Sequence, residues 1–137
     1  ADEAKEIYII NRTLENAKTL QTHMAQYFKV PTFVYEDQEA LKLEADLVIQ
    51  TTGVGMGALK TQMPKCSQSV LESAKVAVDL IYEPWETLFL REAKKKGCTC
   101  INGFGMLYYQ AVIAFELMHH MRCDKEKVLQ IKGELLK

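Results

Sequence analysis

The stretch KVAVDLIYEPWETLFLREAKKKGCTCIN, residues 75–102, contains the unit that decides the fold. Its opening run, residues 75–82, is apolar and rich in β-branched side chains, which is typical of a buried strand. Residues 86–97 then follow the spacing of an amphipathic helix, and Gly97 is placed to act as its C-cap. Residues 98–102 are predicted to form another strand. Two strands joined by a helix favour parallel pairing, because the helix carries the chain back to the end where the first strand began.

The same alternation continues on both sides of this unit. Further strands are predicted over residues 6–10, 32–36 and 45–52, helices over 14–28, 37–43 and 124–136, and a long apolar helix that ends near His120. We therefore expect an α/β fold, a Rossmann-like parallel sheet flanked by helices. With 137 residues and no linker-like segment, the chain has the length of one domain.

One part of such a fold is missing from the sequence. A dinucleotide-binding domain usually begins with a strand, a GxGxxG turn and a helix, and no such motif occurs here. Residues 1–5, ADEAK, instead have the character of the end of that helix. We therefore expect a partial domain over residues 1–137, lacking the first strand and the glycine-rich turn, as in a truncated or excised segment.

Composition argues against several classes of function. The formal net charge is −1, with acidic and basic residues interspersed, so nothing favours binding to nucleic acid or to an anionic membrane. No apolar run approaches the roughly 20 residues that a membrane span requires, and the opening residues do not resemble a signal peptide. The pair His119-His120 lacks a carboxylate at metal-ligand spacing, so no metal site is expected. The cysteines form no CxxC pair and predict reduced thiols in a cytoplasmic protein: Cys66, Cys98, Cys100 and Cys123.

In doubly wound sheets, ligands bind beyond the carboxyl ends of the strands, and four such ends here carry unusual residues. The first end is Asn11-Arg12-Thr13. An acidic residue at this end would bind the ribose hydroxyl of NAD, whereas an arginine favours the 2′-phosphate of NADP. An equally open alternative is that Arg12 is only a solvated surface residue and Thr13 only a helix N-cap.

The second and third ends are TTGVGMG, residues 51–57, and DLIYEPWE, residues 79–86. The glycines permit close approach of a ligand to the backbone, although a flexible surface loop would have the same composition. Asp79 interrupts an apolar strand, so it is either satisfied by backbone donors or placed for a purpose. Tyr82 could reach into a cleft, but a packed tyrosine with its hydroxyl in water is the commoner case.

The fourth end is INGFGMLYYQ, residues 101–110. Gln110 shares a predicted inner helix face with apolar residues: Met106, Ile113, Leu117 and Met121. A buried amide without a partner costs about 1–3 kcal/mol, so we expect Gln110 to bond to protein, water or a ligand. Its position in the first helical turn, next to two glycines, favours a ligand.

Four co-linear segments closely resemble the C-terminal, NADP-binding part of shikimate dehydrogenases, including their quinate/shikimate relatives. The segments are INRT (10–13), ADLVIQTTGVGM (45–56), VDLIYEPWETLFLREAKKKG (78–97) and INGFGMLYYQAVIAFEL (101–117). They follow the family's order and spacing over essentially the whole chain. Their combination is therefore far more specific than any one of them.

The resemblance implies an NADP-dependent oxidoreductase of aromatic amino-acid biosynthesis, in which NADPH reduces 3-dehydroshikimate to shikimate. In that family the catalytic lysine and aspartate belong to an N-terminal substrate domain, so this chain would contain no catalytic residue. That absent domain would be the partner of this chain, and the isolated chain would show no turnover and very weak NADP binding. The resemblance leaves open whether the substrate is shikimate or quinate and whether the cofactor is NADP or NAD. It also leaves open whether the protein is a homodimer or has another oligomeric state.

The resemblance also assigns residues to the site. Substrate binding would involve Tyr82 and Gln110. The cofactor-binding residues would be Asn11, Arg12 and Thr13 at the 2′-phosphate, Val54, Gly103 and Met106 beside the nicotinamide, and Thr52 and Gly53 along the dinucleotide. Two departures, Gln50 for the usual Asn and Gly53 for Pro, would loosen the loop that walls the cofactor. Asn16 occupies a position that often carries a second basic residue, so selectivity for NADP would depend mainly on Arg12.

Other functions are also compatible with the sequence. One is a non-catalytic cofactor-binding or assembly module that complements a separately supplied N-terminal half. Another is a quinate/shikimate dehydrogenase that uses NAD or NADP. A third is glutamyl-tRNA reductase, whose NADP domain also carries an Asn-Arg-Thr strand end. The segments VDLIYEPWET and GFGMLYYQ, and the lack of a basic surface for tRNA, argue against this third function.

Overall fold

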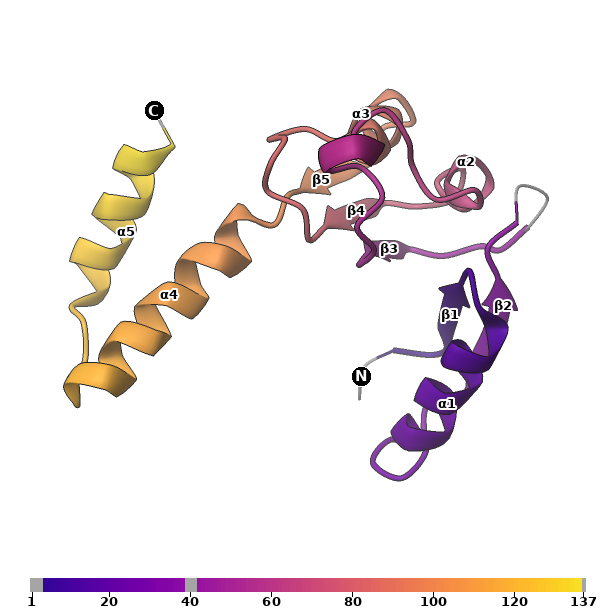
Figure 1. The fold of residues 1–137 in the computed structure, drawn as a ribbon, viewed down its shortest axis with the longest axis horizontal. Coiled ribbons are helices and arrows are strands. Elements are labelled where there is room, and N and C mark those ends of the chain that lie inside the picture. The colour runs from indigo at the N-terminus through magenta and orange to yellow at the C-terminus, as the bar shows by residue number, and fades with distance from the viewer. Residues whose placement is uncertain (1–3, 39–41, 137) are drawn as a thin grey trace.

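The computed structural model describes residues 4–38 and 42–136, and its strands and helices alternate along the chain (Figure 1). In order, the elements are β1 (Ile7–Asn11), α1 (Leu14–Met24), β2 (Thr32–Glu36), β3 (Leu47–Gln50), a 3-10 turn η1 (Gly57–Leu59), α2 (Ser67–Val70), β4 (Val76–Asp79), α3 (Leu88–Lys95), β5 (Thr99–Ile101), α4 (Phe104–His119) and α5 (Lys125–Leu135). The α/β alternation predicted from the sequence is therefore confirmed.

The paired strands are all parallel, but they form two sheets in place of one. β1 pairs with β2, with Ile7 opposite Thr32 and Asn11 opposite Glu36. In the other sheet β4 lies between β3 and β5. Among the described residues, β1 has a strand on one side only, and so does β3 (Figure 1). The parallel pairing, with helices beside the sheets, agrees with the Rossmann-like fold class predicted from the sequence.

Several predicted boundaries were too long. α1 ends at Met24 instead of residue 28, and β3 is shorter at both ends than predicted. β4 ends at Asp79, because the Asp79 side chain accepts a hydrogen bond from the Ile81 N–H and turns the chain there. The described part of the helix predicted over 37–43 is not helical, and residues 39–41 lie outside the described residues. The short elements η1 and α2 were not predicted.

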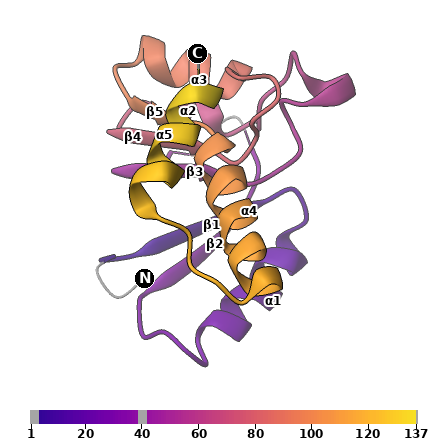
Figure 2. The same ribbon diagram turned by 90° about the vertical axis from the view of Figure 1, so that its left-hand side faces the viewer.

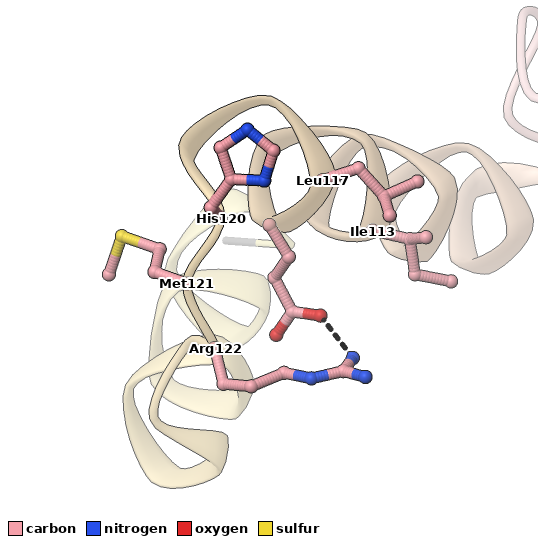
Figure 3. Close-up of a pocket in the computed structure, with 6 residues that line it drawn as sticks. Ile113, Leu117, His120, Met121 and Arg122 are labelled. Atoms are coloured by element: carbon pink, nitrogen blue, oxygen red, sulfur yellow. Dashed lines mark hydrogen bonds and ion pairs between the residues drawn. The ribbon is translucent and has the colours of Figure 1, made fainter.

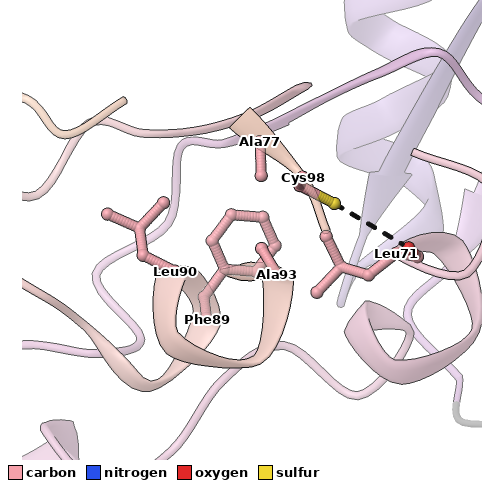
Figure 4. Close-up of a cluster of buried hydrophobic side chains, with 6 residues drawn as sticks. All are labelled: Leu71, Ala77, Phe89, Leu90, Ala93 and Cys98. Atoms are coloured by element: carbon pink, nitrogen blue, oxygen red, sulfur yellow. Dashed lines mark hydrogen bonds between the residues drawn. The ribbon is translucent and has the colours of Figure 1, made fainter. Parts of the chain in front are cut away.

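A buried apolar cluster joins α3 to β4 and β5 (Figure 4). Its members are Leu71, Ala77, Phe89, Leu90, Ala93 and Cys98. Thr87 is the N-cap of α3 and accepts the Leu90 N–H at 3.3 Å. Gly97, after the end of α3, has φ 84°, the left-handed conformation expected at this position of a helix end. The amphipathic helix predicted over 86–97 is thus present in a shorter form, and its apolar side covers the sheet.

α4 and α5 project from the rest of the molecule as an antiparallel pair (Figures 1 and 2). They are joined by the Tyr108 hydroxyl, which donates to the Val128 carbonyl at 2.7 Å. The predicted inner face of α4 is exposed, with side chains 50–70% accessible: Met106, Ile113, Leu117 and Met121. The prediction of a buried face is therefore wrong for the described residues, because none of their elements covers that side of α4. No helix among these residues is both long and apolar enough to cross a bilayer.

A carboxylate closes the turn between α4 and α5. Glu116 accepts hydrogen bonds from the Cys123 N–H at 2.8 Å and from the Arg122 guanidinium at 2.9 Å. The Cys123 N–H, followed by Arg122, lowers the pKa of Glu116 below its ordinary value. The connector between the two helices is therefore bonded to α4 through a side chain whose ionised form these bonds favour.

We expect this turn to loosen when the pH falls through the lowered pKa of Glu116. A carboxyl group whose pKa is lower in the folded than in the unfolded protein stabilises the fold above its unfolded pKa, and that contribution is lost on acidification. The measurement is the protection factor of the Cys123 amide in hydrogen exchange, followed from neutral pH to below the usual range of glutamate. Glu116→Gln should remove the pH dependence, and a pH-independent wild type would contradict the prediction.

Candidate cofactor and substrate site

The glycine-rich loop after β3 is fixed by the last residue of the strand. Gln50 is buried, and its Nε2 donates to the Val54 carbonyl at 2.8 Å. Its Oε1 accepts from the Thr52 N–H, and the Thr52 hydroxyl in turn accepts from the Val54 N–H at 3.2 Å. The expectation that Gln50 loosens this loop was therefore wrong, because its longer amide reaches both ends of the turn.

Asp79 at the end of β4 is fully buried. Its Oδ2 accepts from the Thr87 hydroxyl at 2.6 Å and its Oδ1 from the Ile81 N–H at 3.0 Å. Gln50 Nε2 lies 3.5 Å from Oδ1. Burial raises the pKa of Asp79, and the bonds from Thr87 and Ile81 oppose that shift. Of the two alternatives for Asp79, satisfaction by local donors is confirmed, with a hydroxyl added to the backbone donor.

The loop that carries Tyr82 meets the start of α4. The Gly103 N–H donates to the Ile81 carbonyl at 3.0 Å. A Cβ on Gly103 would lie 1.9 Å from the Leu80 carbonyl oxygen, so this position requires glycine. Tyr82 follows β4 at a distance of three residues and is 47% exposed. The structure thus places the Gly103 backbone against the protein's own carbonyl groups and leaves the Tyr82 ring accessible.

The segment Asn11-Arg12-Thr13, at the carboxyl end of β1, lies on the other sheet. Asn11 Oδ1 accepts the Thr13 N–H at 2.8 Å. Thr13 occupies the N-cap position of α1, but its side chain makes no capping bond, so that part of the N-cap prediction was wrong. Arg12 is exposed, and no ion pair among the described residues includes it. Its guanidinium is therefore accessible to an anion.

Met106 and Gln110 lie one turn apart on α4 and are both exposed. The prediction that Gln110 is buried was wrong. Its amide is accessible to water, so it needs no partner within the protein. An exposed amide and thioether at one end of α4 can instead contact a molecule or a domain that approaches that end.

The four strand-end segments that were predicted to bind ligands are therefore only partly brought together. Residues 51–57, 79–87 and 101–106 converge at Ile81: a Cβ on Gly55 would lie 3.3 Å from its side chain, and its carbonyl binds Gly103. The Asn11-Arg12-Thr13 end belongs to the separate β1–β2 sheet. Thr87, which completes the contacts of Asp79, was missed, although a threonine just before an amphipathic helix is a recognisable N-cap signal.

Two hollows on the surface of the described residues lie elsewhere. One, of about 310 Å³, is at the end of α4 (Figure 3) and is lined by Ile113, Glu116, Leu117, His120, Met121 and Arg122. A larger one, of about 560 Å³, lies between α4 and α5. Neither is lined by a predicted site residue. Within the described residues, no group of three His, Cys, Asp or Glu side chains could hold a metal ion.

Comparison with known proteins identifies relatives over most of the chain. Over 131 residues, 40% are identical to shikimate dehydrogenase (NADP(+)) from Caldanaerobacter subterraneus subsp. tengcongensis, which covers 94% of this chain and 46% of the relative. Over 119 residues, 39% are identical to the protein of the same name from Methanococcus aeolicus, covering 85% of this chain and 42% of the relative. No protein-family model matches the chain.

Solved structures show the same relationship. The shikimate 5-dehydrogenase fusion with chorismate mutase from Clostridium acetobutylicum has a TM-score of 0.76 and 31% identity, over 96% of this chain and 45% of that protein. A shikimate dehydrogenase in complex with NADP+ has a TM-score of 0.71 and 28% identity, over 90% of this chain and 52% of that protein. By sequence and by fold, the chain therefore belongs to the shikimate dehydrogenase family, and it spans a little under half the length of the two relatives in the sequence comparison.

Proposed function

We propose that this chain is the cofactor-binding segment of an NADP-dependent shikimate dehydrogenase, and that it acts together with a substrate domain. The observation that carries the proposal is the convergence of three strand-end segments at Ile81, in a chain whose relatives are named for this activity. Ligands of parallel α/β sheets bind at such ends, because loops from neighbouring strands meet there. The substrate class is 3-dehydroshikimate and shikimate.

The adenosine end of NADP would bind beyond β1. Arg12 is exposed and pairs with no acidic side chain among the described residues, so it can form charge-assisted bonds to the 2′-phosphate. Asn11 and Thr13 fix the turn through their 2.8 Å bond and would contribute further polar contacts to the phosphate. Asn16, exposed on the first turn of α1, adds no positive charge.

The nicotinamide end would lie at the other sheet, beside the β3 and β5 loops. Thr52, Gly53 and Val54 form the turn fixed by Gln50 and would line the dinucleotide. Gly103 and Met106 at the start of α4 would flank the ring. Tyr82 and Gln110, whose polar groups are both accessible, would bind the substrate.

When bound, the nicotinamide supplies the hydride that is transferred to the substrate carbonyl. The residues of this chain bind and orient the two reactants, which is a large part of the catalysis of such a reaction. The proton would come from a lysine and an aspartate of the substrate domain. The isolated chain should therefore hold no catalytic residue.

The open side of β1 and the open side of β3 support the need for further chain. Each strand pairs on one side only among the described residues, and unpaired N–H and C=O groups of a strand accept another strand readily. A parallel strand inserted between them would join the two sheets into one layer. The partner would then supply both this strand and the substrate domain.

The test is reconstitution of activity. The isolated chain, given shikimate and NADP+, should show no turnover and only very weak NADP+ binding. Adding the part of the Caldanaerobacter relative that the 40% identity match leaves out should restore NADPH formation. Full turnover by the chain alone would contradict the proposal, and stable complex formation without turnover would favour a non-catalytic assembly module.

Because the four cysteines are free thiols, we further propose that the protein works in the reducing cytoplasm.

A further inference from the structure

The buried carboxylate of Asp79 lies where three loops of the proposed site meet. Every buried side-chain nitrogen and oxygen among the described residues has a hydrogen-bond partner, and Asp79 has Ile81 and Thr87 as its close donors, with Gln50 at the longer distance of 3.5 Å. An apolar residue would fill the end of β4 without the desolvation that a carboxylate requires. The position therefore calls for an explanation beyond the packing of the strand.

One hydrogen bond of Asp79 connects it to the proposed substrate side of the site. Oδ1 binds the Ile81 N–H at 3.0 Å, and this bond turns the chain immediately before Tyr82. The carbonyl of the same Ile81 receives the Gly103 N–H at 3.0 Å, and Gly103 is the residue that precedes α4. The direction of Tyr82 and the start of α4 are therefore fixed by one peptide unit on each side of Ile81.

A second contact of Asp79 leads to the cofactor side. Gln50 Nε2 lies 3.5 Å from Asp79 Oδ1 and 2.8 Å from the Val54 carbonyl. The longer of these contacts is the weaker, and Gln50 keeps its bonds to the loop without it. Asp79 should therefore act strongly on the loop that carries Tyr82 and weakly on the loop after β3.

A third contact ties the carboxylate to the core. The Thr87 hydroxyl donates to Oδ2 at 2.6 Å and accepts the Leu90 N–H at 3.3 Å, at the first turn of α3. α3 is held by the apolar cluster that contains Phe89 and Leu90. This contact gives the carboxylate a rigid reference, so that its position is set by the core and not by the loops.

We propose that Asp79 is a positioning residue, which holds the Tyr82 loop and the start of α4 in a fixed relation to the core so that the substrate is oriented against the cofactor. This inference rests on the proposed function for its kinetic consequences. Its structural part concerns the amides of Ile81 and Gly103 and is independent of any ligand.

The first experiment uses hydrogen exchange of the chain itself. Asp79→Ala should raise the exchange rates of the Ile81 and Gly103 amides about tenfold or more, since a buried bond is lost. Asp79→Asn keeps an acceptor for Ile81 and should leave both rates close to wild type. Asp46→Ala, which removes an exposed carboxylate paired with Lys75, is the matched control and should change neither. Unchanged rates in Asp79→Ala would overturn the proposal even if NADP never binds.

The second experiment uses the reconstituted enzyme. Asp79→Ala should raise the KM for shikimate about tenfold while changing the KM for NADP+ severalfold less, and Asp79→Asn should rescue most of the loss. Gln50→Leu should show the opposite split, because it frees the cofactor loop. If Asp79→Ala lowers only the unfolding temperature and leaves both KM values unchanged, the residue is purely structural and the proposal is overturned. If wild-type reconstitution fails, the proposed function fails, and the exchange rates alone decide the role of Asp79.

Discussion

Gly103→Ala should destabilise the chain by about 3 kcal/mol, the upper end of the usual cost of overpacking, because the backbone it meets cannot yield. The added Cβ would lie 1.9 Å from the Leu80 carbonyl oxygen and 2.5 Å from its carbon. Relief requires either the loss of the 3.0 Å bond from Gly103 to Ile81 or the movement of α4 away from β4. Both outcomes separate the start of α4 from the loop that carries Tyr82.

The measurement is urea unfolding followed by the fluorescence of Trp85, whose ring lies 5.4 Å from that of Phe104 at the start of α4. Gly53→Ala is the matched control. A Cβ there meets no atom within 4 Å, so its free energy of unfolding should stay within about 0.5 kcal/mol of wild type. Equal effects of the two substitutions would show that the close approach at Gly103 is not what the position requires.

Arg12→Ala should lower the preference of the reconstituted enzyme for NADPH over NADH by about 10- to 100-fold. Charge-assisted hydrogen bonds to a phosphate are worth about 1.5–3 kcal/mol. The substitution removes such bonds from the complex with NADPH, whereas NADH has no 2′-phosphate and makes none of them. No other cation is expected at this strand end, since Asn16 occupies the position of a second basic residue. The loss should therefore appear in kcat/KM with NADPH and leave the value with NADH nearly unchanged.

Lys29→Ala provides the control for Arg12, because it removes an exposed positive charge of the β1–α1–β2 part that is not assigned to the site. It should leave the ratio of the two kcat/KM values close to wild type. If Arg12→Ala and Lys29→Ala lower the preference equally, the effect is one of general charge. If neither changes it, the 2′-phosphate binds elsewhere and the assignment of Asn11, Arg12 and Thr13 is wrong.

The sequence was sufficient for the order of the five strands and the four longer helices, because strand and helix periods are local properties. The run at 75–82 and the amphipathic helix at 86–97 predicted a parallel unit, and the structure contains it with shorter bounds. It was less informative on where strands end. β4 stops at Asp79 because a side chain bonds to the backbone two residues later, and hydrophobic periodicity carries no signal of that bond.

Candidate site residues could be chosen from the sequence where residue type alone restricts the chemistry, and their assignment stays a prediction. The exposed Arg12 after a strand and the glycines of 51–57 could be recognised in this way. Gln110 could not be placed correctly, since an apolar stripe predicts a buried face without saying which chain buries it. Gln50 was predicted to loosen the loop, but it fixes the loop through bonds to Thr52 and Val54. The prediction failed because these bonds depend on the geometry of the turn, which the sequence alone does not give.

The two-sheet arrangement also bears on how the chain behaves in concentrated solution. An uncapped strand is a template for association with any other extended segment, including one from an identical molecule. On β3, Leu47 and Ile49 are 50% and 52% exposed beside such an edge, which adds apolar surface to the unused peptide groups. Self-association and binding of the complementing segment would then draw on the same peptide groups. That segment should therefore act as a solubilising agent for the chain, apart from any role in the reaction.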